Sequence, residues 1–534
     1  MTKTTTTLLL LFISTFTFSQ QEFSVDIEPM VIPNAPGIHS YAVGKTDDQK
    51  WVVLGGRVDG LHQRQPFAAF LDQDNNKNVF VIDVTTNQVW SSDISVLAPS
   101  IYEQLKSTNQ EFYQRDTMLY IIGGYGFSAT ANDHITFPNV TAISLNELAD
   151  AVITNTSITP YFRQITDVNL KVTGGQLGYL DSTFYLVGGQ LFDGRYNPMG
   201  PDHGPGFIQQ YSNEIRTFKI QDDGVNLSIT NYAAQHDTIN LHRRDYNMSP
   251  QIFPNGDAGF TAFSGVFDYA DMPYLNTVDI TPNNYNTVNS FNQYLSQYHS
   301  AKLPIYDTVD NVMHTIFFGG ISQFTMDSQA NLIEDLDVPF VKTISRVSRF
   351  SDWSMQETKL GYIEMPTLVG SGAEFIPINQ YYYEHEILNL ESLPNARTLV
   401  GYIYGGIESS AENIFFINDG TQSSASNVIF EVYIDKSTAN QDEITINGDN
   451  SINLNIYPNP ARRKLNISYF SPEMKDMNLT VYSSEGRMVL SERLQPEKIG
   501  VNERKIDVSE LSDGLYIIEI NNGSYSDQKQ FIKK

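Results

Sequence analysis

The sequence has 534 residues, a formal net charge of −27 and no cysteine, so its length allows two or more domains. A chain this acidic offers little basic surface to neutralise phosphates, and we therefore expect no nucleic acid partner. The missing cysteines exclude disulfides, thiolate catalysis and thiolate-bound metal, while 30 tyrosines and 31 phenylalanines favour a strand-rich fold.

The N-terminal residues have the pattern of a secretory signal. Lys3 precedes an apolar run from Leu8 to Phe18, and Ser19 is a small residue just before two glutamines. The run is too short to anchor the chain in a bilayer, so we predict a signal peptide at residues 1–20. No later stretch is long and apolar enough for a membrane helix, and we expect no membrane span.

Short apolar runs that end on a glycine pair recur along the chain. Five runs end on Gly-Gly and a weaker copy ends on Ser-Gly: Val52–Gly56, Leu119–Gly126, Tyr185–Gly189, Ala262–Gly265, Ile316–Gly320 and Tyr402–Gly406. Their separations are mostly 55 to 76 residues. A regular return at this distance indicates a repeated supersecondary unit, in which glycine ends a strand where the backbone turns tightly or packs closely.

Each unit predicts a four-stranded antiparallel meander. One apolar run precedes the glycine pair, and an alternating run such as Asn78–Trp90 follows it. The pattern resembles the kelch repeat, whose units are the blades of a β-propeller. This resemblance implies an all-β domain at residues 21–436 with six blades, seven being the alternative. The last unit lacks an outer strand, and we expect Phe23–Ile27 to supply it and to close the ring.

The C-terminal region has different motifs. After a polar linker at residues 437–450, the chain carries Tyr457-Pro458-Asn459-Pro460, Ser484-Glu485-Gly486 and Gly514-Leu515-Tyr516 in order. These motifs resemble the C-terminal sorting domain of the type IX secretion pathway of Bacteroidota. The resemblance implies a small β-sandwich at residues 451–534 and the type IX secretion machinery as a partner. It also implies a protein that is secreted or attached to the cell surface.

The candidate functional residues lie in loops. In kelch propellers, the loops that follow the glycine pairs and the loops between blades share one face around the central channel, and loops commonly carry function. The resemblance therefore groups six candidate catalytic residues: His134, Arg195, His203, His242, Arg244 and Tyr246. For Arg244, and for His39 and His299 at the starts of inner strands, the alternative is a structural role in tying blades together.

Signals for a metal or cofactor are weaker. Asp72–Asn78 alternates oxygen ligands as a calcium loop does, but Lys77 stands where such a loop needs glycine. His134, His203 and His242 could bind zinc together, without the close spacing of a typical zinc motif. We therefore predict no catalytic cofactor and leave a structural calcium or zinc ion open.

A rim rich in His, Arg and Tyr suits an acidic sugar. Once Arg neutralises the carboxylate of a uronic acid, a Tyr or a neutral His can take the C5 proton, and a second such group can protonate the oxygen that leaves C4. The residue types resemble those of propeller-fold ulvan lyases and uronate-oligosaccharide dehydratases. That resemblance implies β-elimination from an acidic poly- or oligosaccharide to a 4,5-unsaturated uronate. Arg195 or Arg244 would neutralise the carboxylate, and Tyr246 and His134 would be the base and acid candidates. His203 and His242 would support them.

Two other classes stay open at this point. A non-catalytic glycan-binding or adhesion propeller would use its histidines and arginines only to join its blades, and it predicts affinity without a product. A sugar mutarotase or another kelch-fold isomerase is also compatible with the pattern. A copper enzyme like galactose oxidase is excluded, because its cross-linked cysteine cannot exist in this chain.

Overall fold

The protein is described from a computed structural model that covers residues 23–282, 284–327, 331–437, 443–446, 454–471, 476–484, 486–496, 500–522 and 526–534. The predicted signal peptide and most of the predicted linker lie outside these residues. The described chain is all-β, as expected, with two short α-helices, α1 (Pro99–Leu105) and α2 (Leu145–Ile153).

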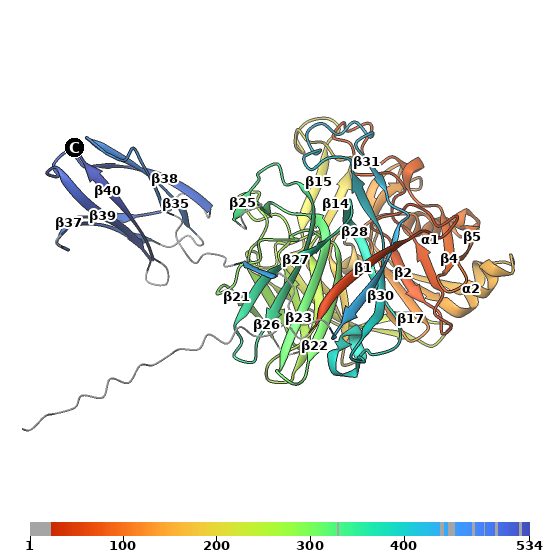
Figure 1. The fold of residues 1–534 in the computed structure, drawn as a ribbon. Helices are drawn as coiled ribbons and strands as arrows, with labels where there is room; N and C mark the ends of the chain where they lie inside the picture. Colours follow the sequence, from red (N-terminus) through yellow and green to blue (C-terminus); the bar gives the residue numbers. More distant parts are fainter. Residues whose placement is uncertain are drawn as a thin grey trace, which may run out of the picture.

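The described part of the N-terminal domain forms six large antiparallel sheets, which we number in chain order (Figure 1). Sheet 1 contains β2 (Ala42–Lys45), β3 (Trp51–Leu54), β4 (Asn78–Asp83) and β5 (Gln88–Asp93). Sheet 2 contains β6 (Glu111–Arg115), β7 (Met118–Ile122), β10 (Asn139–Ser144) and β11 (Phe162–Thr166). Sheet 3 contains β12 (Gln176–Leu180), β13 (Thr183–Val187), β16 (Glu214–Asp222) and β17 (Leu227–His236). Sheet 4 contains β18 (Asn247–Ile252), β19 (Ala258–Phe263), β20 (Thr277–Ile280) and β21 (Tyr285–Val288). Sheet 5 contains β22 (Ala301–Asp307), β23 (Val312–Ile321), β26 (Phe340–Arg349) and β27 (Met355–Glu364). Sheet 6 contains β28 (Leu368–Pro377), β30 (Arg397–Ser409), β32 (Ile429–Asp435) and β1 (Ser24–Met30).

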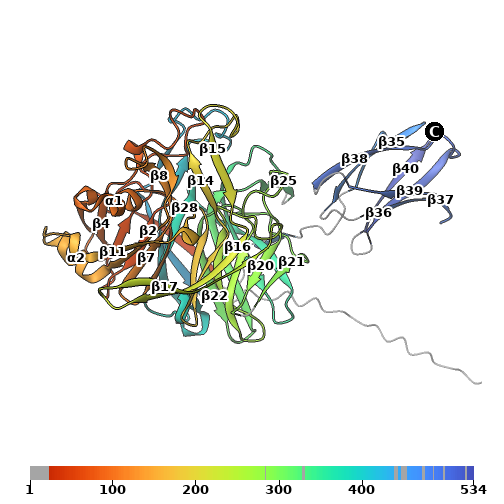
Figure 2. The ribbon, with the colours of Figure 1, turned by 180° about the vertical axis from the view of Figure 1, so that it is seen from behind.

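Smaller elements decorate these sheets. The additional strands are β8 (Tyr125–Ser128), β9 (Asp133–Thr136), β14 (Gln190–Gly194), β15 (Phe207–Tyr211), β24 (Phe324–Met326), β25 (Leu332–Glu334), β29 (Leu388–Asn389) and β31 (Ser423–Ala425). The described 3-10 turns are η1 (Asp72–Asp74), η2 (Ile94–Val96), η3 (Thr159–Tyr161), η4 (Val168–Leu170), η5 (Glu384–Glu386) and η6 (Leu390–Ser392). In Figure 1, β14, β15 and β31 project from the same end of the domain, which we call the upper face, and Figure 2 shows β14 and β15 at that end from behind.

Apolar side chains fill the space between neighbouring sheets. Along β4, Val79 and Val81 are buried while Asn78 and Phe80 are half-buried, as alternation along a strand predicts. In the described chain, every pair of consecutive sheets shares a core cluster, and sheets 6 and 1 share one as well. Trp51 of sheet 1, for example, packs against Tyr404 of sheet 6 with ring centroids 5.9 Å apart.

A closed circle of backbone hydrogen bonds joins the six described sheets. Near the start of each innermost strand, one residue donates its N–H to the carbonyl oxygen of its counterpart in a neighbouring sheet. These ring residues pair as Ser40 to Gly372, Gly372 to His299, His299 to Asp245, Asp245 to Gly174, Gly174 to Asn109, and Asn109 to Ser40, with N···O distances of 2.8 to 3.2 Å. The last bond returns to Ser40, whose own N–H ties sheet 1 directly to Gly372 of sheet 6.

The outer strand of sheet 6 comes from the N-terminal end of the described chain. β1 pairs antiparallel with β32 from Ser24↔Asp435 to Met30↔Ile429, which confirms that prediction (Figure 1). β1 also contacts sheet 5, because the Val25 N–H donates to the hydroxyl of Tyr362 at 3.0 Å. Phe23 and Val25 are both buried. β1 therefore contacts both sheet 5 and sheet 6, and it pairs the start of the domain in sequence with its last strand, β32.

Five of the six glycine motifs tie their sheet to the next one. The N–H of the second glycine donates to the residue two positions before a ring residue of the following sheet: Gly56 to Ser107, Gly124 to Val172, Gly189 to Arg243, Gly265 to Gln297, and Gly406 to Ile38, at 2.8 to 3.1 Å. The first glycine has no room for a side chain. At Gly123, where φ is +66°, a Cβ atom would lie 2.0 Å from the carbonyl oxygen of Val172.

Replacing Gly123 by alanine is expected to destabilise the protein by about 3 kcal/mol or more, because the new methyl group meets a backbone carbonyl that cannot move freely. The matched control is Gly224→Ala, since Gly224 also has a positive φ, +86°, but a Cβ atom added there would have no described atom within 4 Å. That control should cost only about 1–2 kcal/mol, from the left-handed backbone alone. Denaturant unfolding of both variants measures the difference, and equal losses would refute a steric origin.

The described C-terminal residues form a small β-sandwich. One sheet contains β34 (Asn455–Tyr457), β35 (Lys464–Ser471) and β38 (Gly500–Asp507). The other contains β36 (Met477–Ser483), β37 (Met488–Leu494), β39 (Gly514–Asn521) and β40 (Ser526–Lys533). Both sheets contribute to one core, in which Leu465 and Ile467 meet Val481 and Ile518.

The segment predicted as a plain linker contains a strand. β33 (Glu443–Ile446) adds to the outer edge of sheet 5 by pairing with β27. Arg346 of β26 holds it there through an ion pair with Glu443 at 2.6 Å. The polar residues on either side of β33 hid this short strand, which alternates Glu443, Ile444, Thr445 and Ile446 and completes an open sheet edge.

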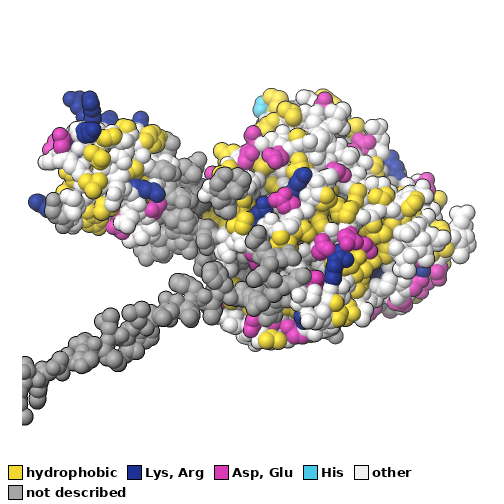
Figure 3. All heavy atoms as spheres, in the orientation of Figure 1, with side chains coloured by type: hydrophobic (Ala, Val, Ile, Leu, Met, Phe, Trp, Pro, Cys, Tyr) yellow, Lys and Arg dark blue, Asp and Glu magenta, His cyan; other side chains and the backbone are white. Residues whose placement is uncertain are grey.

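Two expectations, that the chain has no membrane span and no nucleic acid partner, concern the helices and the surface of the protein. No helix of the described chain is long and apolar enough to cross a membrane. On the face shown in Figure 3, the lysine and arginine side chains of the described residues occur singly or in small groups, interspersed with acidic ones. This face therefore lacks the contiguous basic surface that a nucleic acid would need.

Candidate functional site

A cluster of aromatic and basic side chains gathers above the ring residues. His62 lies in the loop between β3 and β4, Tyr196 follows β14, and Tyr211 ends β15. His242 and Arg244 lie in the connection between β17 and β18, directly before the ring residue Asp245. We call His62, Tyr196, Tyr211, His242 and Arg244 the rim cluster. Its members are all half-buried, so they are ordered by neighbours yet reachable from solvent.

Arg244 is the electrostatic centre of the rim cluster. Its Nη1 forms an ion pair with Asp245, its Nε donates to the hydroxyl of Tyr211 at 3.2 Å, and its guanidinium lies 5.2 Å from the ring centroid of Phe267. Burial acts to lower the pKa of Arg244, but Asp245 and Tyr211 outweigh it and raise the pKa. Its Nη2 donates to no other described residue, so one N–H edge remains for a ligand.

His242 is held between two tyrosine rings. It stacks on Tyr211 at 3.8 Å and on Tyr269 at 4.5 Å between centroids, with interplanar angles of 21° in both cases. Its Nδ1 lies 2.8 Å from the side-chain oxygen of Asn213, which fixes the orientation of the ring. Burial lowers the pKa of His242, so the ring is neutral at neutral pH. Such a stack offers a flat surface on which a sugar ring can rest.

His62 and Tyr196 form the other half of the rim cluster. His62 stacks on Phe70 at 4.8 Å and meets Tyr196 edge-on at 4.6 Å. Burial lowers the pKa of His62 to about 4, and the charges of Arg57 and Arg244 act in the same direction. The Nδ1 atom faces the carbonyl oxygen of Gln63 at 3.3 Å, so the neutral ring carries its hydrogen there and leaves Nε2 free to accept a proton.

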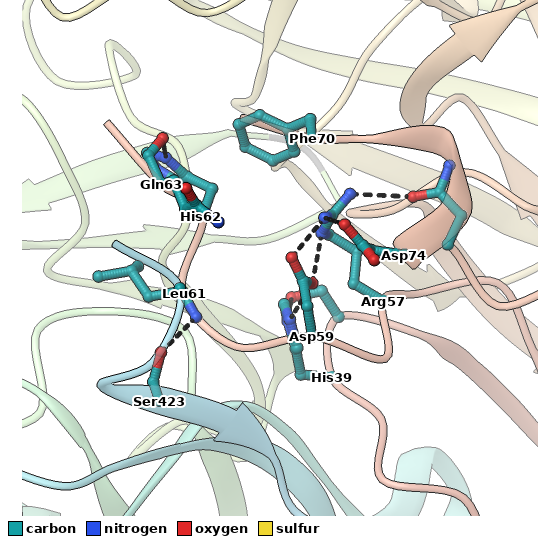
Figure 4. A network of polar contacts seen from close by, with 12 residues as sticks. His39, Arg57, Asp59, Leu61, His62, Gln63, Phe70, Asp74 and Ser423 are labelled. Carbon is teal, nitrogen blue, oxygen red and sulfur yellow. Dashed lines mark hydrogen bonds and ion pairs between the residues drawn. The ribbon is translucent and has the colours of Figure 1, made fainter. Parts of the chain in front are cut away.

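A buried polar network supports this half of the cluster (Figure 4). Arg57, only 2% exposed, donates two hydrogen bonds to Asp59, at 2.8 and 2.6 Å, and one to Asn75 at 3.0 Å. The Nε2 atom of His39 lies 3.8 Å from the Asp59 carboxylate. These contacts hold the loop that carries His62 against the ring residue Ser40, whose hydroxyl contacts His39 at 3.1 Å. These contacts favour a structural role for His39, which helps to hold this loop in place.

The predicted candidates His134 and Arg195 lie at the edge of this region. His134 is buried, and its Nε2 contacts the carbonyl oxygen of Phe70 at 2.9 Å. Burial lowers its pKa, and the charge of Arg195 lowers it further, which shows that the two side chains are near one another. Arg195 is half-buried and forms no hydrogen bond or ion pair with another described residue. It therefore retains its full donor capacity.

Two predicted candidates are placed elsewhere. His203 is exposed in the loop between β14 and β15, where its backbone carbonyl accepts a hydrogen bond from Asn197. Tyr246 is fully buried, and its hydroxyl donates to the carbonyl oxygen of Val187 at 2.7 Å. The base role considered for Tyr246 does not fit this position, because its only polar side-chain atom is engaged in joining sheets 3 and 4. We leave Tyr246 out of the site.

Residues that the sequence interpretation did not select complete the site. His62 and Tyr196 lie in loops that follow glycine pairs, whereas Tyr211 lies at the end of β15, and no spacing motif distinguishes any of the three. The useful signal was the position of the loops themselves, since His62 follows the first glycine pair and Tyr196 and Tyr211 follow the third.

The possible calcium loop is occupied by internal ion pairs. Asp72 accepts from Lys77 at 2.9 Å and from Lys106 at 2.5 Å, and Asp74 lies 3.8 Å from Arg57. Among the described residues, no group of three or more His, Asp or Glu side chains has an arrangement that could hold a metal ion. His134 contacts the carbonyl oxygen of Phe70, and His242 contacts the side chain of Asn213. Each ring nitrogen thus contacts a different protein group and not a common metal position.

Comparison with known proteins defines the C-terminal region first. Residues 455–534 match the family described as "Secretion system C-terminal sorting domain". The protein is thus a cargo of the type IX secretion machinery, and it is secreted or attached to the cell surface.

The chain also matches solved structures. The solved structure titled "Structure of YjhT" is 11% identical, with a TM-score of 0.41, over 74% of this chain and 100% of that chain. This likeness is too weak to carry an argument about function. No curated protein matches the sequence.

Proposed function

We propose that the six sheets are the blades of a kelch-like β-propeller and that the rim cluster is the active site of a secreted lyase or dehydratase for uronate-containing glycans. The circle of backbone hydrogen bonds supports the ring, because each innermost strand is tied to the next and the sixth to the first. The single observation that carries the functional proposal is the half-buried Arg244, with a free N–H edge, surrounded by a neutral histidine and tyrosines.

Arg244 would neutralise the carboxylate of the uronate. A guanidinium pairs well with a carboxylate because it stays protonated and presents several N–H groups in one plane. Asp245 and Tyr211 occupy Nη1 and Nε and fix the side chain before substrate arrives. Withdrawal of charge from the carboxylate makes the neighbouring C5 proton more acidic, which is the prerequisite for elimination.

His62 and Tyr196 would carry the protons. The Nε2 atom of neutral His62 accepts the C5 proton as the C5–H bond breaks, and that electron pair forms the C4=C5 double bond. The C4–O bond breaks at the same time, and the departing oxygen takes the proton of the Tyr196 hydroxyl. The product is a 4,5-unsaturated uronate together with the released sugar or water. His62 and Tyr196 return to their starting states by exchanging the proton through solvent.

A second candidate is a glycan-binding or adhesion protein without chemistry. The stack of Tyr211, His242 and Tyr269 favours it, because Tyr269 is 69% exposed and offers a ring face to solvent. Stacked aromatic rings bind the apolar faces of sugars in proteins that form no product. This candidate predicts saturable glycan binding that leaves the glycan intact.

Incubation of the purified protein with ulvan and other uronate oligosaccharides separates the two candidates. The lyase proposal predicts a growing far-ultraviolet absorbance from the new C=C bond. Saturable binding without absorbance change would support the adhesion protein instead. Neither binding nor product with any uronate glycan would remove both candidates.

The proposal predicts an unusually low acidic limit of activity. His62 must be neutral to accept the C5 proton, and burial lowers its pKa from 6.5 to about 4. We therefore expect kcat/KM to stay level on acidification to about pH 5 and to fall about tenfold per pH unit well below pH 4. A pH–rate profile measures this limit. A fall that begins near 6.5, the ordinary value for histidine, would contradict His62 as the base.

A further inference from the structure

Below the ring residues lies a cavity of about 240 Å³. The innermost strand of every one of the six described sheets contributes to its wall: β2, β6, β12, β18, β22 and β28. His385 and Glu386 also line it, and they come from the segment between β28 and β30, which follows the end of β28 remote from the ring. This volume approaches the lower end of small-molecule pockets and suits a ligand no larger than one sugar ring.

The cavity wall combines charged donors and acceptors. His299 lies 3.1 Å from the carboxylate of Glu374, and that contact, together with the charge of Lys302, lowers the pKa of Glu374 although burial acts to raise it. Lys302 therefore faces an ionised carboxylate, and Glu386 is also within electrostatic reach of it. The wall contains two lysines, Lys45 and Lys302, and four acidic residues, Glu111, Asp245, Glu374 and Glu386.

Lys302 is the group whose bonding is incomplete. Lys45 donates to the carbonyl oxygen of Pro377 at 2.7 Å and to the side chain of Asn379 at 3.1 Å. Lys302 is half-buried and lines the same cavity, yet its side chain forms no hydrogen bond and no ion pair within 4.0 Å with another described residue. An ammonium group partly removed from bulk water needs acceptors within bonding distance, whereas Glu374 and Glu386 act on Lys302 only through longer-range electrostatics.

Apolar surface lies next to these polar groups. Val43, Met248, Phe375 and Ile376 line the cavity together with the ring of Tyr113. A wall with apolar patches, an unbonded ammonium and a paired carboxylate matches a ligand with C–H faces and several hydroxyl groups. Hydroxyls can accept from Lys302 and donate to Glu374, which a purely anionic or purely apolar ligand cannot do.

We propose that this cavity binds one polyhydroxylated ligand of monosaccharide size, held by Lys302 and Glu374. The site is separate from the rim cluster, and the inference does not depend on the proposed elimination. Neutral hexoses and hexuronates share the required hydroxyls, and they differ in the carboxylate that Lys302 would recognise.

Titration calorimetry of the purified full-length protein with D-glucose and with D-glucuronate tests the proposal. We expect saturable binding of at least one probe with a stoichiometry of one. Lys302→Met should weaken binding at least about tenfold, which is about 1.4 kcal/mol. Lys50→Met, on the hairpin between β2 and β3, should leave it unchanged. Preference for glucuronate that disappears in Lys302→Met would assign carboxylate recognition to Lys302.

Crystals of the unaltered protein soaked in the better probe provide a second readout that needs no variant. Sugar density between Lys302 and Glu374 supports the site. The inference is overturned if neither probe binds, if Lys302→Met binds as well as the unaltered protein, or if the soaked cavity contains only water. Loss of binding in Arg244→Gln but not in Lys302→Met would place the sugar in the rim cluster and also overturn it.

Discussion

Replacement of Arg244 by glutamine is expected to lower kcat/KM on a uronate glycan by about 30-fold, which corresponds to about 2 kcal/mol of lost transition-state stabilisation. Glutamine keeps a donor but removes the charge that neutralises the sugar carboxylate. Arg244→Lys should recover part of the loss, because lysine restores the charge without the planar N–H edge. Initial rates of unsaturated product formation measure all three proteins.

Two further arginine variants make this prediction specific. Arg493→Gln, in the C-terminal domain and with a side chain 73% exposed, should keep the full rate. Arg195→Gln should lose less than Arg244→Gln, because Arg195 has no described partner that fixes its position. A full rate in Arg244→Gln with a large loss in Arg195→Gln would transfer the role to Arg195, and full rates in both would reject an arginine at the carboxylate.

Removal of strand β1 is expected to have the largest effect on stability. A protein that begins after Met30 loses the seven paired residues of β1 and the burial of Phe23 and Val25. Burial of two such side chains contributes about 3–6 kcal/mol, a large share of the roughly 5–15 kcal/mol that stabilises a typical domain. We expect the truncated protein to be largely unfolded or to melt well below the intact one in thermal unfolding.

The truncation also allows a test in trans. A synthetic peptide of residues 23–30 should restore stability in a concentration-dependent way, because it can occupy the open edge of β32. Glu28→Ala is the matched control in the intact chain, since Glu28 is 54% exposed and its side chain bonds only to Arg397 among described residues, and it should change stability by less than about 0.5 kcal/mol. An unchanged melting temperature after truncation would show that β1 does not join the ends of the domain.

The repeat could be predicted from sequence because it depends on local chemistry. Glycine at positive φ and alternating apolar residues are visible in any one unit, and so the sheets and the role of β1 were within reach. The backbone hydrogen bonds that the glycines form could not be predicted, because Gly124 and Val172 are 48 residues apart and meet only in the folded chain. The strand β33 was missed for a similar reason, since its pairing partner lies on sheet 5.

The site could be predicted only in part. Arg244 and His242 were selected because they are charged or polar residues in a loop, and they do lie together. Tyr246 is only two residues after Arg244, but it already belongs to the packing against β13, and its side chain points into the core. A sequence gives no direct signal for that change of direction where a loop becomes a strand. His62 needed the structure for a similar reason, because burial and not sequence context lowers the pKa of its ring.

Mass spectrometry of the products tests the central claim most directly. If the protein eliminates across C4 and C5, digestion of a uronate oligosaccharide yields a terminal uronate that is lighter by one water than its saturated form, and Arg244→Gln yields far less of it. Saturated products with water added would identify a hydrolase. An unchanged oligosaccharide that nevertheless binds to the protein would identify a glycan-binding protein, and either result would contradict the elimination.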